Sequence, residues 1–336
     1  MLALAAVVAL VWTLSRLDSR RLWAVAREAD PWWLALSVVP IALRFLLWGV
    51  KWRYMLALRE RIPLSLAMRI LAAGSFVNLT TPTAKLAGGV VRALLLRRRR
   101  GFSLPVAYGW SMADQVTNVL GNLLLFGVLS LVVGLGFRDL EYAGAFLIGG
   151  GLALLFVIGT AVCRGWGWRQ LRNERFAVWL WNKVPRRFRR EDADHGTILQ
   201  AIFGPLLHDC GGTARYGSYL LMSAAAFGSL CLANALTLRA LGVDAPLLLV
   251  AVAVVIGYFA GVMIGIWGGV GVTEAALTGL FVQFGVPAEQ AAMGALLHRA
   301  IFYAVVLGWG GHGLWAEGRP TLQEPTAGSS ATNPAR

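Results

Sequence analysis

Four ionisable residues lie within stretches of sequence that are otherwise apolar, and they are the first candidates for chemistry: Arg92, Asp114, Glu274 and Arg299. A charged side chain at membrane depth is costly unless it pairs with another charge or faces a wet cavity. Such residues either lock helices together or bind a charged ligand. We expect ligand binding here, because all four lie on two segments of similar pattern.

The shared pattern is a glycine break, a short apolar helix with one charge in its first turn, a second glycine and a long apolar span. Arg92 follows Gly89 by three residues, and Glu274 follows Gly271 by three. The remaining carboxylate and arginine lie 13 and 14 residues after the second glycine. Paired broken segments in the two halves of a transporter mark its binding site. We therefore expect an inverted repeat in which Arg92 and Glu274 face each other as a buried ion pair; the alternative partner of Arg92 is Asp114.

Both segments carry glycine, proline or charge where a lipid-facing helix would not. The break residues are Pro82, Gly88, Gly89, Gly269 and Gly271. Irregular backbone at membrane depth is tolerated only where protein or a wet cavity surrounds it. We expect the regions 64–96 and 267–286 to be re-entrant.

Three basic residues of these segments are candidates to bind a lipid headgroup, namely Lys85, Arg92 and Arg299. Arginine and lysine donate charge-assisted hydrogen bonds to phosphate oxygens. Asp114 and Glu274 would balance the buried cations and could carry a coupling proton.

Apolar helices must position these residues. The chain has 336 residues, of which 57% are hydrophobic and 14% charged, whereas a soluble domain carries about 25% charged residues. A membrane span needs about 20 apolar residues. The sequence predicts an all-α, polytopic membrane protein of about eight hydrophobic segments. The candidates are 1–15, 32–50, 64–80, 104–136, 142–163, 217–240, 245–266 and 288–315. The first lacks a basic region before it, so we expect a retained span rather than a signal peptide.

The loops fix an expected orientation. Residues 1–315 form the predicted transmembrane domain, interrupted by a basic loop at 164–216, and residues 316–336 form a polar tail that we expect to be disordered. Basic loops face the cytoplasm, which favours a cytoplasmic 164–216 and a multi-pass location in the inner membrane. Loop charges fit both a chain in which every segment crosses and a chain with two re-entrant segments. The breaks favour the second.

Other function classes lack support. The net charge is +14, but the arginines cluster with tryptophans at the ends of apolar segments, which is typical of membrane interfaces and not of nucleic-acid binding. The three cysteines are isolated, and no metal-ligand spacing, nucleophile–His–acid set or phosphate-binding loop is recognisable. We expect no enzyme activity, cofactor or metal. Arg44 and Arg69 lie near span ends, where snorkelling accounts for them.

The sequence resembles the transmembrane region of lysylphosphatidylglycerol synthases, a flippase-like domain that also occurs alone. The residues that carry the likeness are Arg44 to Arg53, Gly74 to Pro82, Gly88-Gly89 with Arg92, Gly101 to Ser103, Gly268 to Ala276, Gly285-Val286 and Arg299. Val90 stands where the family usually has an acidic residue, and Asp114-Gln115 replaces its acidic–Arg pair. No counterpart of the soluble aminoacyl-transferase domain is recognisable. The resemblance implies lipid translocation or lipid binding.

We expect the protein to bind a phospholipid, or a polyprenyl-phosphate-linked headgroup, and to move it across the cytoplasmic membrane. The polar head of a lipid crosses hydrocarbon only at high cost, which a charged groove would lower. The alternative is a non-transporting partner that scaffolds a glycosyltransferase or lipid synthase through loop 164–216. A membrane-embedded lipid-modifying enzyme is a weaker third reading.

Topology gives a direct test. In a cysteine-free background, a single cysteine at position 325 should react with a membrane-impermeant maleimide only from the cytoplasmic side. The loops 51–63 and 164–216 should behave in the same way. Labelling of position 325 from outside alone would favour the chain in which every segment crosses.

Overall fold

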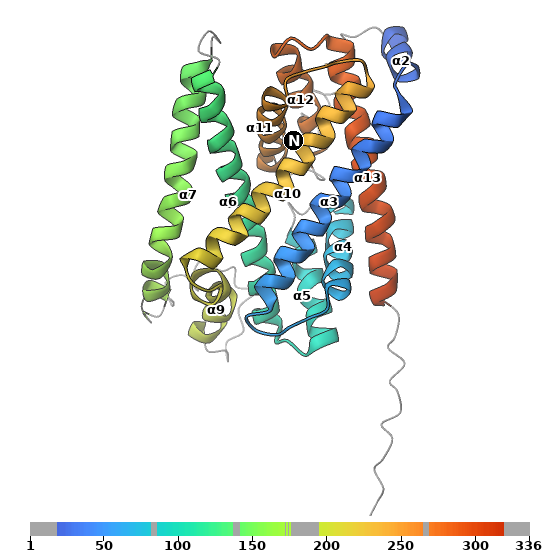
Figure 1. Ribbon diagram of the computed structural model, residues 1–336. Helices are drawn as coiled ribbons and strands as arrows, with labels where there is room; N and C mark the ends of the chain where they lie inside the picture. Colours follow the sequence, from blue (N-terminus) through green and yellow to red (C-terminus); the bar gives the residue numbers. More distant parts are fainter. Residues whose placement is uncertain are drawn as a thin grey trace, which may run out of the picture.

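The computed structural model describes residues 19–81, 86–136, 142–171, 173, 175, 195–264 and 269–318. Over these residues the chain is helical, and no strand occurs within them. The helices are α2 (Ser19–Arg27), α3 (Pro31–Leu56), α4 (Leu64–Thr80), α5 (Leu86–Arg100), α6 (Leu104–Gly136), α7 (Ala143–Leu171), α9 (His195–Gly204), η2 (Pro205–Asp209), α10 (Thr213–Ala240), α11 (Leu247–Ile264), α12 (Val272–Gln283) and α13 (Ala288–Gly318). Figure 1 shows them as a bundle of long, steeply crossing helices.

Five helices of the described chain are long and apolar enough to cross a membrane, namely α3, α6, α7, α10 and α13. The expected all-α, polytopic membrane class is confirmed, but the number of spans is smaller than expected. The helices at 64–80 and 247–261 are apolar but shorter. The expected span 1–15 lies outside the described residues.

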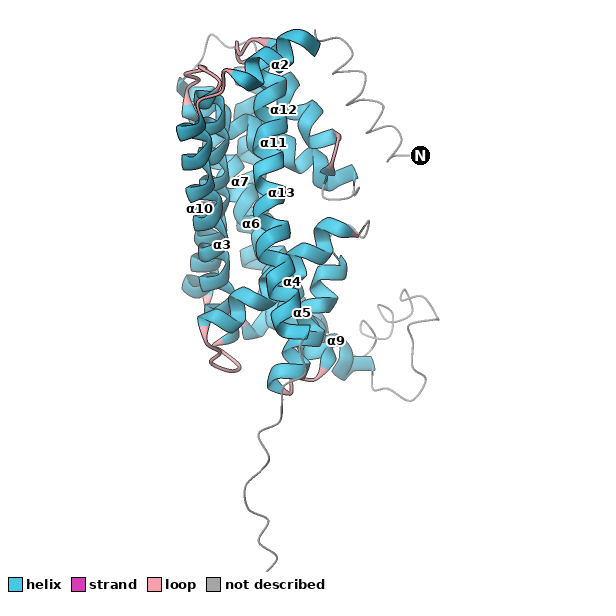
Figure 2. Cartoon of the chain, turned by 90° about the vertical axis from the view of Figure 1, so that its right-hand side faces the viewer, coloured by secondary structure: helices cyan, strands magenta, loops and turns pink. Residues whose placement is uncertain are grey.

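The shorter helices form two hairpins. α4 packs on α5, and α11 packs on α12. The α4–α5 hairpin lies toward one end of the bundle and the α11–α12 hairpin toward the other (Figures 1 and 2). The segment expected as the span 245–266 forms α11, which is the first arm of a hairpin whose second arm, α12, lies in the expected break region 267–286. Its apolar sequence is that of a span, but Gly257 and Gly261 let α12 fold back closely against it.

One sequence of elements occurs twice along the chain: a long helix, a hairpin and a second long helix. The first copy is α3, α4–α5 and α6, and the second is α10, α11–α12 and α13. Within each copy the hairpin's second arm packs on the following long helix. Between copies α3 packs along α10, α4 packs against α13, and α11 packs against α6. Each hairpin therefore contacts a long helix of the other copy as well as the long helix that follows it in its own copy.

Glycines allow the arms of each hairpin to approach closely. A Cβ on Gly88 would collide with the carbonyl oxygen of Gly74 and with Asn78. The Asn78 Oδ1 accepts a hydrogen bond of 2.8 Å from the Gly88 backbone N–H. In the second hairpin, a Cβ on Gly261 would collide with Thr273. Both hairpins thus depend on close contact between their arms.

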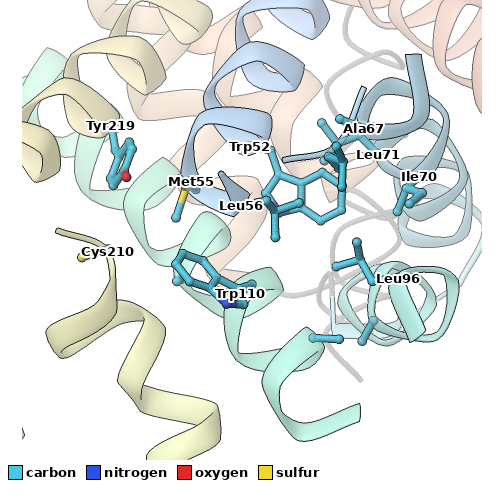
Figure 3. Packing of buried hydrophobic residues seen from close by; sticks show 14 of the residues in the cluster. Trp52, Met55, Leu56, Ala67, Ile70, Leu71, Leu96, Trp110, Cys210 and Tyr219 are labelled. Carbon is cyan, nitrogen blue, oxygen red and sulfur yellow. The ribbon is translucent and has the colours of Figure 1, made fainter. Parts of the chain in front are cut away.

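A hydrophobic core joins the first hairpin to the long helices. Trp52, Met55 and Leu56 of α3 are fully buried against Ile70 and Leu71 of α4. Leu96, Trp110 and Tyr219 extend the same cluster to α5, α6 and α10 (Figure 3). This core fixes the end of α3 against the hairpin that carries Arg92.

The flanks of the expected loop 164–216 are folded. α7 continues to Leu171, and α9 and η2 pack against α6 and α7. Arg164 donates a hydrogen bond of 3.0 Å to the carbonyl oxygen of Gly211, and its guanidinium lies 4.2 Å from the Tyr216 ring centroid. The expectation of a loop starting at 164 is therefore wrong at both flanks. Residues 176–194, which hold five of the ten Lys and Arg residues of 164–216, and the tail beyond 318 lie outside the described residues.

The hairpin contact gives a stability prediction. Gly88→Ala should lower the thermal stability of the detergent-solubilised protein, because its Cβ meets backbone; overpacking of this kind costs about 1–3 kcal/mol. Gly279→Ala is the control, since α12 leaves open space at that position. It should leave stability unchanged or raise it. Equal melting temperatures for the two variants would contradict the close packing of α4 and α5.

Candidate functional site: two buried charge clusters

The first cluster is built around Asp114 of α6, which is fully buried. The Lys51 Nζ lies 2.8 Å from Asp114 Oδ1, and the Arg92 guanidinium lies 2.6 Å from Asp114 Oδ2. The Trp48 indole N–H donates a further hydrogen bond of 2.8 Å to Oδ2. One carboxylate therefore joins α3, α5 and α6.

Lys51 is held by neutral acceptors as well as by the carboxylate. Its ammonium donates to Asn118 Oδ1 at 2.6 Å, Ser223 Oγ at 3.0 Å and Thr117 Oγ1 at 3.2 Å. Such partners are required because an ammonium at this depth has no water to hydrogen-bond. Ser223 belongs to α10, so the cluster also reaches the second copy.

Arg92 is held on two sides. It donates a hydrogen bond of 2.9 Å to the Ser111 carbonyl oxygen, and its guanidinium lies 5.3 Å from the Trp52 ring centroid. Arginine suits such a place because its planar, weakly hydrated guanidinium stacks on aromatic rings. We define Lys51, Arg92 and Asp114 as the Asp114 cluster.

The second cluster is built around Glu274, in the first turn of α12. Its Oε2 accepts a hydrogen bond of 2.7 Å from the Gly271 N–H, which caps the helix. Its Oε1 accepts one of 2.7 Å from Arg299 Nε of α13. Gly271 has φ +85°, a left-handed conformation that glycine adopts without strain. The break therefore aims the carboxylate at α13.

Aromatic side chains surround Arg299. The guanidinium donates to the Tyr303 hydroxyl and lies 4.5 Å from the Tyr303 ring centroid and 5.5 Å from that of Tyr258. The buried His298 hydrogen-bonds through Nε2 with the Tyr258 hydroxyl at 3.3 Å. This environment excludes water and strengthens the charge pairing.

Arg44 of α3 is a cation without a carboxylate partner among the described residues. Its guanidinium lies 5.4 Å from the Phe302 ring centroid and 5.7 Å from that of Phe227. One terminal nitrogen, NH1, is buried and has no hydrogen-bond acceptor within the described part of the chain. Phe227 in turn packs edge-on against Tyr258, which connects Arg44 to the surroundings of Arg299. The expectation that Arg44 snorkels to an interface is therefore wrong.

We define Arg44, Glu274 and Arg299 as the Glu274 cluster. Arg44 and Lys51 are seven residues apart, two helical turns, so they lie on one face of α3. The helix contributes one cation to each cluster. In both clusters two cations accompany a single carboxylate, which leaves positive charge at membrane depth.

The expected ion pair between Arg92 and Glu274 is wrong. Each residue pairs with the long helix that follows it in its own copy, Arg92 with Asp114 and Glu274 with Arg299. Within each copy the second arm of the hairpin packs directly on the following long helix, and this packing brings the observed partners together. The two pairs span 22 and 25 residues, with the signs of the charges reversed.

The other expected residues have different outcomes. Gly88 and Gly89 lie in the α4–α5 hairpin, and Gly269 and Gly271 begin the return into α12. Pro82 and Lys85 lie outside the described residues. Lys51 was missed because it was assigned to a loop at 51–63, whereas α3 continues to Leu56. The apolar Met55-Leu56 and the seven-residue spacing from Arg44 were the available signals.

An apolar pocket of about 510 Å³ adjoins the Asp114 cluster. It lies between α6, α7, η2 and α10, with Val119, Phe156 and Leu207 among its lining. Gln115, the neighbour of Asp114, also lines it and packs against Gly89. The pocket thus offers an apolar volume one residue away from a buried charged site.

The fold and these clusters define a polytopic helical membrane protein that holds charged residues within its apolar interior. The chain belongs to the family described as the lysylphosphatidylglycerol synthase TM region, which it matches over residues 1–310. The resemblance inferred from the sequence is confirmed. No curated protein matches the chain. Membership connects the protein with membrane lipid metabolism.

Double-mutant cycles test the observed pairing. Arg92→Met and Asp114→Asn should each destabilise the protein, since breaking a buried ion pair costs about 3–5 kcal/mol. Their effects should be strongly non-additive, because the residues are in contact. Arg92→Met combined with Glu274→Gln is the control, and those effects should add. Additive effects in the first cycle, measured by thermal or denaturant unfolding, would exclude the Arg92–Asp114 contact.

Proposed function

We propose that the protein binds a lipid with an anionic, phosphate-bearing headgroup and moves that headgroup across the cytoplasmic membrane. The observation that supports this most is the excess of cations over carboxylates in both buried clusters. An uncompensated cation in an apolar interior is costly. An anionic headgroup would supply the missing charge.

A phosphate can bind these clusters by acting, like a carboxylate, as the hydrogen-bond acceptor of an arginine. Its oxygens accept the same bidentate hydrogen bonds from arginine that a carboxylate accepts. At the Glu274 cluster, Arg44 offers a guanidinium with an unsatisfied nitrogen beside Arg299, so phosphate can bind without displacing Glu274. At the Asp114 cluster, phosphate competes for Arg92 while Lys51 keeps the carboxylate paired. Lys85 would add a cation at the break of the first hairpin.

The hairpins provide a route between the two clusters. We propose that α4–α5 and α11–α12 are re-entrant and enter the membrane from opposite sides, as their positions toward opposite ends of the bundle suggest. Lipid tails would remain in the bilayer or in the apolar pocket beside Gln115. Asp114 and Glu274 would keep the clusters near neutrality between headgroups, and either could carry a coupling proton.

The proposed role is binding and translocation, not catalysis. The transmembrane region of lysylphosphatidylglycerol synthases is the part without aminoacyl-transfer chemistry. The alternative, a scaffold for a lipid synthase or glycosyltransferase, would need lipid binding but no movement of the headgroup. Transport in a purified system separates these two.

Arg44→Gln is the sharpest variant for that test. Arg44 makes no hydrogen bond to the described chain, so its removal should leave melting temperature unchanged or raise it. Transport should nevertheless fall by roughly tenfold, the value of one charged hydrogen bond. The measurement is dithionite bleaching of fluorescent phosphatidylglycerol in vesicles that contain the purified protein. Mass spectrometry of co-purified lipid identifies the natural ligand class.

Arg59→Gln serves as the control, since it removes an equal charge from an exposed position between α3 and α4. It should transport like the unmodified protein. Bleaching no faster than in protein-free vesicles, with lipid still co-purifying, would favour the scaffold. Equal loss in Arg44→Gln and Arg59→Gln would remove Arg44 from the pathway.

A further inference from the structure

A third charged cluster lies at the end of the bundle where α4 begins and α5 and α13 end (Figure 2). Its centre is Glu317, whose side chain is 2% exposed. Glu317 Oε1 lies 2.5 Å from Arg69 Nε, and Oε2 lies 2.6 Å from Arg99 Nε. The expectation that Arg69 only snorkels is therefore wrong. One carboxylate holds two guanidinium groups side by side.

The geometry leaves hydrogen-bond donors free. Arg69 uses its Nε atom for Glu317, and both of its terminal nitrogens lack an acceptor among the described residues. Arg99 uses Nε and NH2 toward Glu317, which leaves NH1. Glu317 therefore orients the guanidinium groups of Arg69 and Arg99, and some of their N–H donors remain without an acceptor among the described residues.

Arg69, Arg99 and Glu317 line a pocket of about 430 Å³. Arg100 also lines it, and among the described residues its ionic contact is with Glu60 at 3.4 Å, with about a third of each side chain exposed. Three guanidinium groups thus line the pocket against the single carboxylate of Glu317, and Leu66 lines it on an apolar side. A pocket with excess guanidinium donors and an apolar wall is suited to a phosphate ester with an attached hydrocarbon portion.

We propose that this pocket is a binding site for a phosphate ester, distinct from the Asp114 and Glu274 clusters. The exposed Trp315 nearby on α13 is typical of the membrane–water boundary. At that depth the phosphate can belong to a lipid headgroup from the adjacent leaflet or to a soluble ester from the aqueous phase. The proposal does not depend on lipid translocation, because none of its residues belongs to the two buried clusters.

Cross-linking provides a readout local to this pocket. The full-length protein in mild detergent is titrated with phosphatidic acid that carries a diazirine near its glycerol. Labelled peptides containing residues 63–69 or 312–317 are then quantified. We expect saturable labelling there, and affinity weaker by roughly a hundredfold in Arg69→Gln/Arg100→Gln, because each of the two lost charged hydrogen bonds weakens binding by about tenfold. Arg69→Lys keeps the charge but not the fork and should show an intermediate loss.

Arg61→Gln is the matched control, since it removes the same charge from an exposed position between α3 and α4, outside the pocket lining. It should label normally. Unlabelled phosphatidic acid should compete in all cases. Competition by glycerol 3-phosphate at equal concentration identifies a site for soluble phosphate esters, and its failure identifies a lipid site.

Two results would overturn the proposal: equal loss in Arg61→Gln and Arg69→Gln/Arg100→Gln, or no loss in either. Arg100→Gln alone guards against misfolding, because within the described part of the chain Arg100 makes one weak ionic contact. It should keep the melting temperature and still reduce labelling. Labelling that persists in Arg44→Gln, when transport is lost, shows that this site and the translocation pathway are separate.

Discussion

The structure depends on the requirement that a buried charge be compensated. Asp114 illustrates it, since one carboxylate accepts from Lys51, Arg92 and Trp48 and so ties together helices that are distant in sequence. Removing Asp114 would leave the two cations in an apolar interior without a carboxylate.

The second copy meets the same requirement with different chemistry. There the carboxylate also caps its own helix, so Glu274 links the backbone of the glycine break to Arg299. Tyr303 and Tyr258 replace the amide and hydroxyl groups that surround Lys51. The second cluster is consequently richer in aromatic rings. The Arg44 guanidinium lies over the rings of Phe227 and Phe302, in place of a hydrogen-bond acceptor.

Sequence patterns predicted the helical class, the four central charges and the bounds of most helices, because apolar length and glycine breaks are local properties. α6 has the bounds that its apolar run predicts. The partner of Arg92 was left between Glu274 and Asp114, since the choice depends on how each hairpin packs on the long helix that follows it. The sequence also did not predict that α11 and α12 form a hairpin, because a buried hairpin arm and a membrane span have the same apolar composition. Lys51 and Glu317 were missed because helices extended beyond their apolar runs.

The reversed order of charges in the two copies has an electrical consequence. The first hairpin carries a cation, Arg92, and the second carries an anion, Glu274, and the two lie toward opposite ends of the molecule. Withdrawal of both hairpins toward their own ends would move positive charge one way and negative charge the other. The two displacements add instead of cancelling. Each elementary charge moved across a full potential of 100 mV contributes about 2.3 kcal/mol, so such a motion would be sensitive to membrane voltage.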